Sequence, residues 1–345
     1  MNEQKNTPTD SPITRLAKRI THPLAESFQK QRTKGIYYAL TSAFFLGMSP
    51  IFGKKAIIAG VPPLAVVALR TILATFLLFG VITIYKREYL FIYPAGVLGC
   101  VIAGWTNGLG SLFYYSALGR LDAGVGQLLY SLYPLFLAIW MILDRNKPSK
   151  LTIIRLSLAI PAAFLLTQAN TGNVDIVGII EMLAAAALYA LHIPINQKVL
   201  YEMPAPTVTF YTLVAMSAIV VPTFFFSGEG SFPTTLTAWG PLIGLTLVTF
   251  SSRLTLFLGV KNIGGMQTAL LGLSELLITL IFAHFWLKET LSPYQWTGAA
   301  LLTISLILVG WDKTAAHVKQ RPGGWLSWLS APRISRDVPW HPDDH

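Results

Sequence analysis

Among the ionisable side chains that interrupt the long apolar stretches of this 345-residue sequence, six are the first candidates for chemistry. They are Arg70, Glu181, His192, Arg253, Glu275 and His284. Placing such a group at the centre of a bilayer costs about 2.5 to 3.5 kcal/mol, so each needs a partner or a water-filled cavity. In membrane proteins these groups mark substrate and ion pathways, which makes all six candidate ligands for a solute or a proton.

Arg253 and Glu275 have the strongest reason to interact. They are expected on consecutive helices joined by a short loop, roughly 10 Å and 14 Å from the same membrane face at 1.5 Å per residue. Antiparallel neighbours would bring the two charges together, directly or through water. Pairing would offset much of their insertion cost, either as a permanent ion pair or as a pair that opens to take a proton or a substrate group.

The other ionisable groups have a structural and a functional reading. Arg70 is expected about two turns from the outer end of its helix, where it could anchor the helix at the interface or clamp a substrate. His192 is suited to proton transfer, although a lone histidine in a membrane helix more often hydrogen-bonds a neighbour. Glu181 is expected near the outer end of its helix, where it could be exposed at the interface or act in a gate.

Polar and aromatic residues suggest a binding cavity between two helices. Tyr130 and Tyr133 are three residues apart and share a helix face, and Asn107 is expected at similar depth on the preceding helix. With Trp105 and Tyr114 they would form apolar walls with a few polar groups, which suits amphipathic solutes such as amino acids. Ordinary helix packing is the alternative for these side chains and for the glycines between them.

The composition shows that these residues must be positioned by membrane helices. Hydrophobic residues make up 53% and charged residues 12%, which is too few charges for a soluble surface. The net charge of +10 does not indicate nucleic acid, because the basic residues flank apolar runs. Cys100 is the only cysteine, so neither an intrachain disulfide nor a thiolate metal cluster can form. No HExxH, P-loop or Asp-rich metal motif is present, so we expect no cofactor, no enzyme and no self-contained ATP-driven pump.

Apolar runs of about 20 residues predict an all-α integral membrane protein with ten transmembrane helices. The predicted spans are 35–57, 63–85, 91–117, 123–143, 151–168, 177–200, 206–226, 236–260, 266–287 and 294–311. The fifth span contains Arg155 and Pro161, and the eighth contains Arg253. Without either span the two termini would face opposite sides of the membrane.

Basic residues in the short loops set the orientation. The arm 1–34, the loops around Lys86 and Lys147, and the tail 312–345 are basic, whereas few basic residues flank the other ends of the spans. We therefore predict a multi-pass membrane protein with both termini in the cytoplasm.

The two halves of the chain are repeats. An offset of about 143 residues aligns Gly35 with Gly178, Lys55 with Lys198 and Pro63 with Pro206. The repeats are predicted at 35–168 and 177–311, with five helices each. An odd number of helices inverts the second copy, an arrangement typical of transporters that rock about a midplane site. Channels can contain repeats as well.

Short motifs resemble the drug/metabolite transporter superfamily, in its ten-helix EamA-type branch. They are Gly-Val-Pro-Pro with Ala68-Leu69-Arg70, Tyr114-Tyr115-Ser-Ala-Leu, Tyr133-Pro134, Leu-Ser-Glu275, Leu287-Lys288-Glu289-Thr-Leu-Ser-Pro and Trp296-Thr-Gly298. Two positions depart from the pattern. Lys147 stands where the first repeat often has an acidic residue, and Leu276 replaces the proline that usually kinks the ninth helix.

The resemblance implies an alternating-access carrier of the inner or plasma membrane that exports amino acids, drugs or related metabolites. We predict substrate contacts from Trp105, Asn107, Tyr114, Tyr130, Tyr133 and Glu275, and intramembrane charge or coupling roles for Arg253, Glu275, His192 and Arg70. A proton is a candidate coupling ion. The alternatives are a lipid flippase or scramblase and, less well supported, a membrane-embedded enzyme. The motifs specify neither the substrate nor the oligomeric state.

Overall fold

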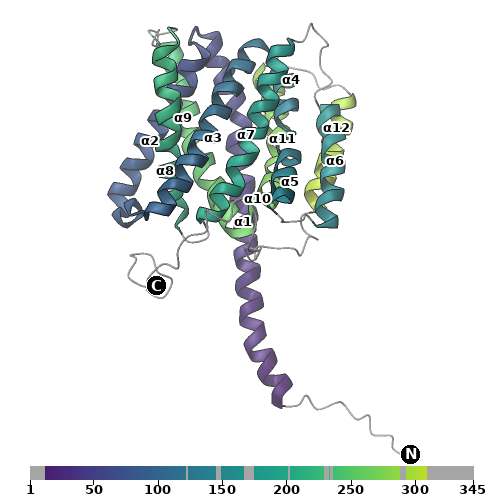
Figure 1. The fold of residues 1–345 in the computed structure, drawn as a ribbon. Helices are drawn as coiled ribbons and strands as arrows, with labels where there is room; N and C mark the ends of the chain where they lie inside the picture. Colours follow the sequence, from purple (N-terminus) through teal and green to yellow (C-terminus); the bar gives the residue numbers. More distant parts are fainter. Residues whose placement is uncertain are drawn as a thin grey trace, which may run out of the picture.

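The computed structural model describes residues 12–121, 123–144, 149–166, 175–200, 203–228, 233, 236–287 and 293–308. Throughout these residues the regular elements are helices, and no strand occurs among them. They form one upright bundle, and the N-terminal part of α1 extends beyond it (Figure 1). The predicted class, an all-α membrane protein, is confirmed.

Both repeats contain the same succession of helices. The first comprises α1 (Pro12–Ile58), α2 (Pro63–Tyr85), the short 3-10 helix η1 (Arg87–Leu90), α3 (Pro94–Arg120), α4 (Ala123–Tyr130), α5 (Tyr133–Leu143) and α6 (Lys150–Leu166). The second comprises α7 (Ile176–Leu200), α8 (Ala205–Phe226), α9 (Leu236–Ile263), α10 (Gly265–Gly272), α11 (Ser274–Leu287) and α12 (Pro293–Ile307). Proline in the first turn starts α2, α3 and α8, because its fixed φ suits that turn and its missing N–H is not needed there.

Six helices are long and apolar enough to cross a membrane unbroken: α2, α3, α7, α8 and most of α1 and α9. The remaining predicted spans are shorter helices or pairs of short helices. The fourth span is α4 followed by α5, and the ninth is α10 followed by α11. Successive spans alternate in direction, so Ile307 at the end of α12 lies on the same side as the beginning of the first span.

The breaks in the fourth and ninth spans correct the prediction of continuous helices. They fall at Ser131–Leu132 and at Leu273, which are equivalent positions under the repeat offset of about 142 residues. Pro134 explains the first break, because it lies in the opening turn of α5 and cannot donate a backbone hydrogen bond. The second break forms without proline. There the Ser274 hydroxyl donates to the carbonyl oxygen of Leu271 at 2.8 Å.

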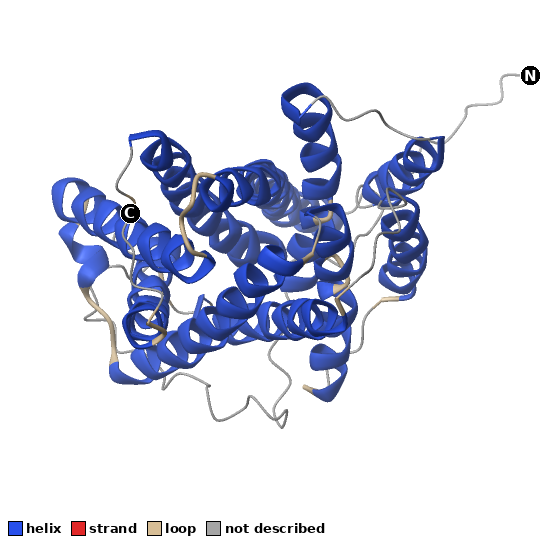
Figure 2. Cartoon of the chain, turned by 90° about the horizontal axis from the view of Figure 1, so that it is seen from above, coloured by secondary structure: helices blue, strands red, loops and turns tan. Residues whose placement is uncertain are grey.

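Figure 2 shows the helical bundle from above. Within it the two repeats interlock. The first helix of each repeat packs on the third long helix of the other, so α1 lies along α9 and α7 lies along α3. The equivalent helices α2 and α8 pack on each other, as do α6 and α12. This exchange places the broken spans next to α1 and α7, with α11 against α1 and α5 against α7.

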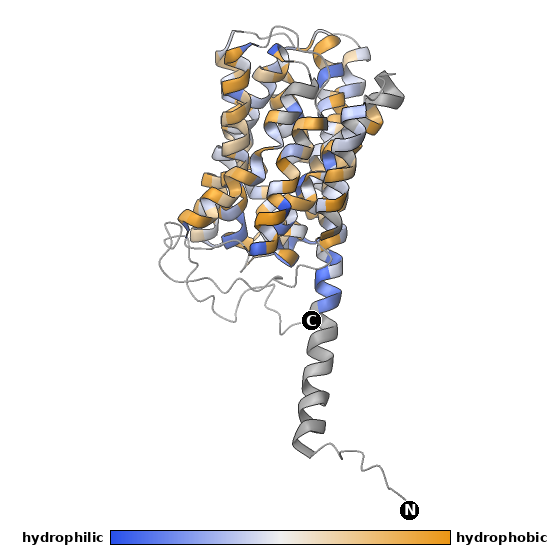
Figure 3. Cartoon of the chain, turned by 90° about the vertical axis from the view of Figure 1, so that its right-hand side faces the viewer, coloured by the Kyte–Doolittle hydropathy of each residue, from blue (hydrophilic) through white to orange (hydrophobic). Residues whose placement is uncertain are grey.

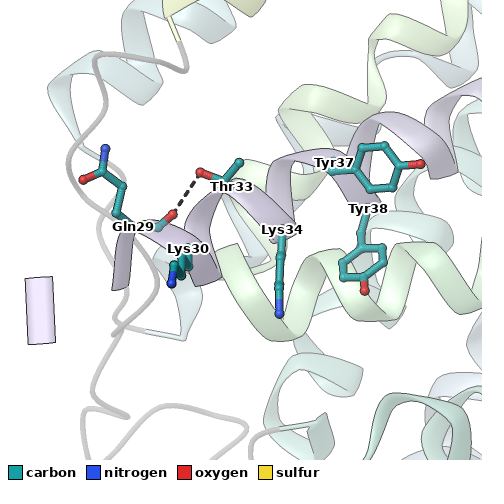
Figure 4. A pocket seen from close by; sticks show the side chains of 6 residues that line it. All are labelled: Gln29, Lys30, Thr33, Lys34, Tyr37 and Tyr38. Carbon is teal, nitrogen blue, oxygen red and sulfur yellow. Dashed lines mark hydrogen bonds between the residues drawn. The ribbon is translucent and has the colours of Figure 1, made fainter. Parts of the chain in front are cut away.

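Hydrophilic residues of α1 gather where the helix leaves the bundle (Figure 3). A hollow on this part of α1 is lined by Gln29, Lys30, Thr33, Lys34, Tyr37 and Tyr38 (Figure 4). The Thr33 hydroxyl donates to the Gln29 carbonyl oxygen at 2.9 Å, one turn earlier. Basic side chains followed by aromatic ones are the order expected where a helix enters a bilayer from the cytoplasm.

Candidate functional site

A narrow cavity lies inside the bundle beside the breaks in the fourth and ninth spans. Side chains from α1, α2, α3, α4, α7, α9 and α11 line it, and its charged residues are Arg70, Arg253 and Glu275. Its volume is about 40 Å³. A water molecule needs roughly 10 to 15 Å³ by this measure, so the cavity has room for a few waters. In this conformation the space is smaller than an amino acid.

Arg70, on α2, joins the two repeats through its guanidinium group. Nη2 donates to the Ser111 hydroxyl of α3 at 3.3 Å, and Nη1 donates to the Thr249 hydroxyl of α9 at 3.3 Å. The group lies over the Tyr115 ring, 4.7 Å from its centroid. Because Arg70 is only 6% exposed, its side chain lies inside the bundle, so the interfacial anchor, one of its two suggested roles, is wrong and the substrate clamp stays a prediction.

Arg253, on α9, also has a polar partner and an aromatic ring beside it. Its Nη2 donates to the Asn107 side-chain oxygen of α3 at 3.2 Å, and its guanidinium lies 5.5 Å from the centroid of the Tyr189 ring. The offset of 142 residues relates Asn107 to Thr249 and Ser111 to Arg253. Each arginine is bonded to one member of the Asn107–Thr249 pair, although the two arginines are not counterparts in the repeat, because Arg253 corresponds to Ser111.

Glu275 enters the cavity from the first turn of α11. Its Oε1 accepts from Gln127 Nε2 at 3.3 Å, and Gln127 Oε1 accepts in turn from the Tyr114 hydroxyl at 3.4 Å. These bonds connect α3, α4 and α11. The backbone here is held against α1, because a Cβ at Gly47 would lie 2.7 Å from the Glu275 carbonyl oxygen. Glycine at that position permits the close approach.

Arg253 and Glu275 line the same cavity without forming an ion pair. Arg253 is bonded to Asn107 and Glu275 to Gln127, so each charge faces a neutral amide. The direct form of the predicted interaction is therefore absent among the described residues, and the water-mediated form stays a prediction. Comparable depths on neighbouring helices bring two side chains to one level, but they do not fix the direction in which each points.

Tyrosine rings form one wall of the site. The centroid of Tyr130 lies 4.8 Å from that of Tyr114 and 5.3 Å from that of Tyr189, and Tyr189 lies 5.0 Å from Tyr133. Tyr114, Tyr130 and Tyr189 line the cavity itself. Tyr133 lies behind them and donates its hydroxyl proton to the Ala269 carbonyl oxygen at 2.8 Å. This bond connects α5 with α10, across the two broken spans.

Three predicted site residues do not line the cavity: Tyr133, which lies behind its wall, Trp105 and His192. Trp105 is 50% exposed on the outside of α3 and does not line the cavity. The prediction is wrong because Trp105 precedes Asn107 by two residues, which is about 200° around a helix. His192 is buried behind Tyr189 and bonded to the backbone oxygen of Tyr189, in agreement with the structural reading of a lone histidine. The side chain of His284 lies outside the described residues.

Tyr189, Ser111 and Thr249 also belong to the site and were not predicted. Tyr189 gives a weak signal, since it stands in an alanine-rich helix three residues before His192. Ser111 and Thr249 could have been found from the repeat, as the counterparts of Arg253 and Asn107. Small hydroxyl residues inside apolar helices are common, so their type alone gave no reason to select them.

Ion pairs close the bundle on both sides of the cavity. Near one end, Arg120 of α3 pairs with two carboxylates. Its Nη1 lies 3.3 Å from Asp175 Oδ2, just before α7, and its Nε lies 3.6 Å from Glu181 Oε2 in α7. The Val177 backbone N–H donates to Asp175, and this bond is the main cause that lowers the pKa of the carboxyl, with Arg120 also contributing. At the other end, Lys198 of α7 lies 3.1 Å from Asp144, the residue after α5.

Arg155 is a further buried charge, outside the cavity. It is fully buried in α6, where Nη1 donates to the Gln267 side-chain oxygen of α10 at 2.6 Å and Nε donates to the Ser305 carbonyl oxygen of α12 at 3.2 Å. The Ser305 hydroxyl donates back to the Arg155 carbonyl oxygen at 3.0 Å. These bonds hold the α6–α12 pair against the broken ninth span.

Sequence comparison finds transporters. The profile of the EamA-like transporter family matches residues 33–168 and again residues 176–311. An uncharacterized transporter of Synechocystis sp. is 23% identical over 226 residues, which is 63% of this chain and 67% of that protein. Another, from Bacillus subtilis, is 25% identical over 184 residues, which is 53% of this chain and 60% of that protein. The chain thus matches about two thirds of the length of these relatives.

An uncharacterized transporter of Archaeoglobus fulgidus is 24% identical over 200 residues, 57% of this chain and 70% of that protein. A solved structure titled "Crystal structure of protein" has a TM-score of 0.68 and is 14% identical, with 83% of this chain and 99% of that chain covered. At this identity the solved structure shows a shared fold and carries no conclusion about the substrate.

Proposed function

Since the chain belongs to the EamA-like transporter family, we propose that it is a secondary transporter that exports small metabolites by alternating access. Amino acids and amphipathic drugs are the candidate solutes. The observation that carries this proposal is the cavity at the breaks of two repeat-equivalent spans, lined by buried charges and tyrosines. Inverted-repeat transporters bind their solutes at such discontinuous helices near the midplane.

The small volume of the cavity suits a conformation of the transport cycle in which no solute is bound. Arg120 with Glu181 on one side and Lys198 with Asp144 on the other join elements that must separate in turn. A rocking motion of the repeats would break one set of contacts while keeping the other. Glu181 then acts in a gate, which is one of the two roles expected from its place in the sequence.

The residues around the cavity have distinct proposed roles. Arg70, Arg253, Asn107, Tyr114 and Tyr130 contact the solute. Glu275 contacts it as well and also serves as the proton site, because it is the one acidic side chain among the described residues that line the cavity. Tyr133 and His192 position the wall from behind. The protein is proposed to reside in the inner or plasma membrane with both termini in the cytoplasm.

Flux measurements test the proposal against a lipid flippase or scramblase. The purified protein is reconstituted into proteoliposomes, and counterflow of labelled amino acids and organic acids is measured beside the translocation of fluorescent lipids. The proposal expects saturable counterflow of at least one solute and no acceleration of lipid movement above empty liposomes. Lipid translocation without solute counterflow would assign the chain to the alternative class.

A further inference from the structure

The charges around the cavity do not balance. Arg70 and Arg253 supply two positive charges, and Glu275 supplies at most one negative charge among the described residues that line the cavity. Both arginines are buried, with 6% of each residue exposed. A site of this kind inside a bilayer carries a net positive charge and attracts an anion.

Each arginine also has an unused donor. Arg70 Nε and Arg253 Nη1 are buried and have no hydrogen-bond partner. Their other bonds, to Thr249, Ser111 and Asn107, hold the guanidinium groups in place. Leaving a charged donor unsatisfied in a low-dielectric interior is unfavourable, so an acceptor from the solute would stabilise both groups.

We infer, on the basis of the transport function proposed above, that the solute is a small carboxylate whose carboxylate group is bound by Arg70 and Arg253. The planar guanidinium group matches a carboxylate better than any other common anion except phosphate. The rings of Tyr114, Tyr130 and Tyr189 would contact the apolar part of the solute. An amine without a carboxylate would add a third positive charge, so organic cations are excluded as solutes.

Two kinds of solute share this chemistry, namely simple carboxylic acids and amino acids. An amino acid has an additional ammonium group, which needs an acceptor. Glu275, beside Gln127, is the one acidic side chain among the described residues that line the cavity, and its carboxylate would accept from the ammonium group. A requirement for the ammonium group would therefore identify an amino acid, and its dispensability would identify a simple acid.

Binding to the wild-type protein tests the inference without any substitution. The ring series comprises L-phenylalanine, 3-phenylpropionate, phenethylamine and 3-phenylpropanol, and the aliphatic series comprises L-leucine, 4-methylpentanoate, isopentylamine and 4-methylpentanol. Each compound is added to the protein in nanodiscs, and the shift in melting temperature is measured. We expect a higher melting temperature only with compounds that carry a carboxylate. Comparing the shift caused by each amino acid with that caused by its deaminated analogue then tells the two kinds of solute apart.

Binding of the amines or alcohols as strong as that of the carboxylates would overturn the inference and leave the proposed transport function intact. If none of these compounds binds and none of the labelled amino acids and organic acids shows counterflow, both the inference and the proposed function fail. If another anion such as a phosphate ester is transported and no carboxylate is, only the inference fails.

Substitutions locate the binding group. Arg253→Gln should weaken carboxylate binding about ten- to a hundredfold, the range expected for a charge-assisted hydrogen bond. Arg253→Lys should keep part of the affinity because it keeps the charge. Arg87→Gln is the matched control, since Arg87 is exposed in η1 and does not line the cavity. Unchanged carboxylate affinity in Arg253→Gln and Arg70→Gln proteins of normal melting temperature would refute the assignment.

Discussion

A single methyl group added at Gly272 should loosen the contact between the two broken spans. Gly272 ends α10, and its hydrogen faces the Tyr133 hydroxyl so closely that a Cβ there would overlap the oxygen. The hydroxyl is bonded to Ala269, and the Tyr133 ring is packed against Tyr189, so the ring has little freedom to retreat. We therefore expect Gly272→Ala to destabilise the protein by about 1 to 3 kcal/mol, the usual cost of overpacking.

A second substitution should remove this cost. In a Tyr133→Phe background the nearest remaining atom, Cζ, would lie 3.6 Å from the new Cβ, an ordinary contact. Tyr133→Phe alone loses the hydrogen bond to Ala269, worth about 0.5 to 1.5 kcal/mol. Adding Gly272→Ala to it should then be nearly neutral, or stabilising by up to about 1 kcal/mol from reduced backbone freedom. The coupling energy expected between the two sites is thus about 1 to 3 kcal/mol.

Melting of the purified variants measures the cycle. At roughly 2 to 4 °C per kcal/mol, Gly272→Ala should lower the melting temperature by several degrees in the wild type and hardly at all with Phe at position 133. Gly80→Ala is the matched control, because a Cβ at Gly80 has no atom within 4 Å. An equal effect of Gly272→Ala in both backgrounds would refute the proposed clash.

Three further predictions test other parts of the account. In a cysteine-free background, Ala59→Cys should react with an impermeant thiol reagent from outside and Glu88→Cys should be protected; the reverse pattern would overturn the orientation. Arg155→Met should lower the free energy of unfolding by about 1.5 to 3 kcal/mol for each charged hydrogen bond that is lost, and it should leave transport per folded molecule unchanged. Loss of transport at normal stability would contradict a structural role. Asn107→Ala should reduce transport more than stability, because it frees Arg253 within the cavity; destabilisation with normal residual transport would assign Asn107 to packing.

The helices and their inverted repeat could be predicted because apolar length and charged loops are local features of the sequence. The breaks could not. The stretch from Leu128 to Leu137 is apolar enough for one helix, and the ninth span lacks the proline that marks the break in the fourth. Leu273 is instead held by tertiary contacts of the helices on either side, including those of Gly272 and Glu275 with distant elements.

The site could be predicted in part, from depth and helical period. Depth grouped Asn107 with Tyr130, and separately Arg253 with Glu275, and in the structure all four line one cavity. Depth does not predict the direction in which a side chain points from its helix axis. For this reason Trp105 was wrongly placed in the cavity, and the absence of a direct ion pair between Arg253 and Glu275 was not predicted. For Arg70, the short distance from the helix end suggested a position at the membrane interface as one alternative. In the structure its side chain is buried inside the bundle.

Counterflow in proteoliposomes by a matched pair of variants tests the central claim, that the cavity at the helix breaks is the transport site. Tyr130→Ala removes a ring from the cavity wall, and Trp105→Ala removes an exposed ring from α3. With equal amounts of folded protein reconstituted, we expect counterflow to fall at least about tenfold in Tyr130→Ala, as for loss of roughly 1.4 kcal/mol of solute binding, and to remain normal in Trp105→Ala. Normal counterflow in Tyr130→Ala together with a loss in Trp105→Ala would contradict the claim and move the transport path to the outer face of α3.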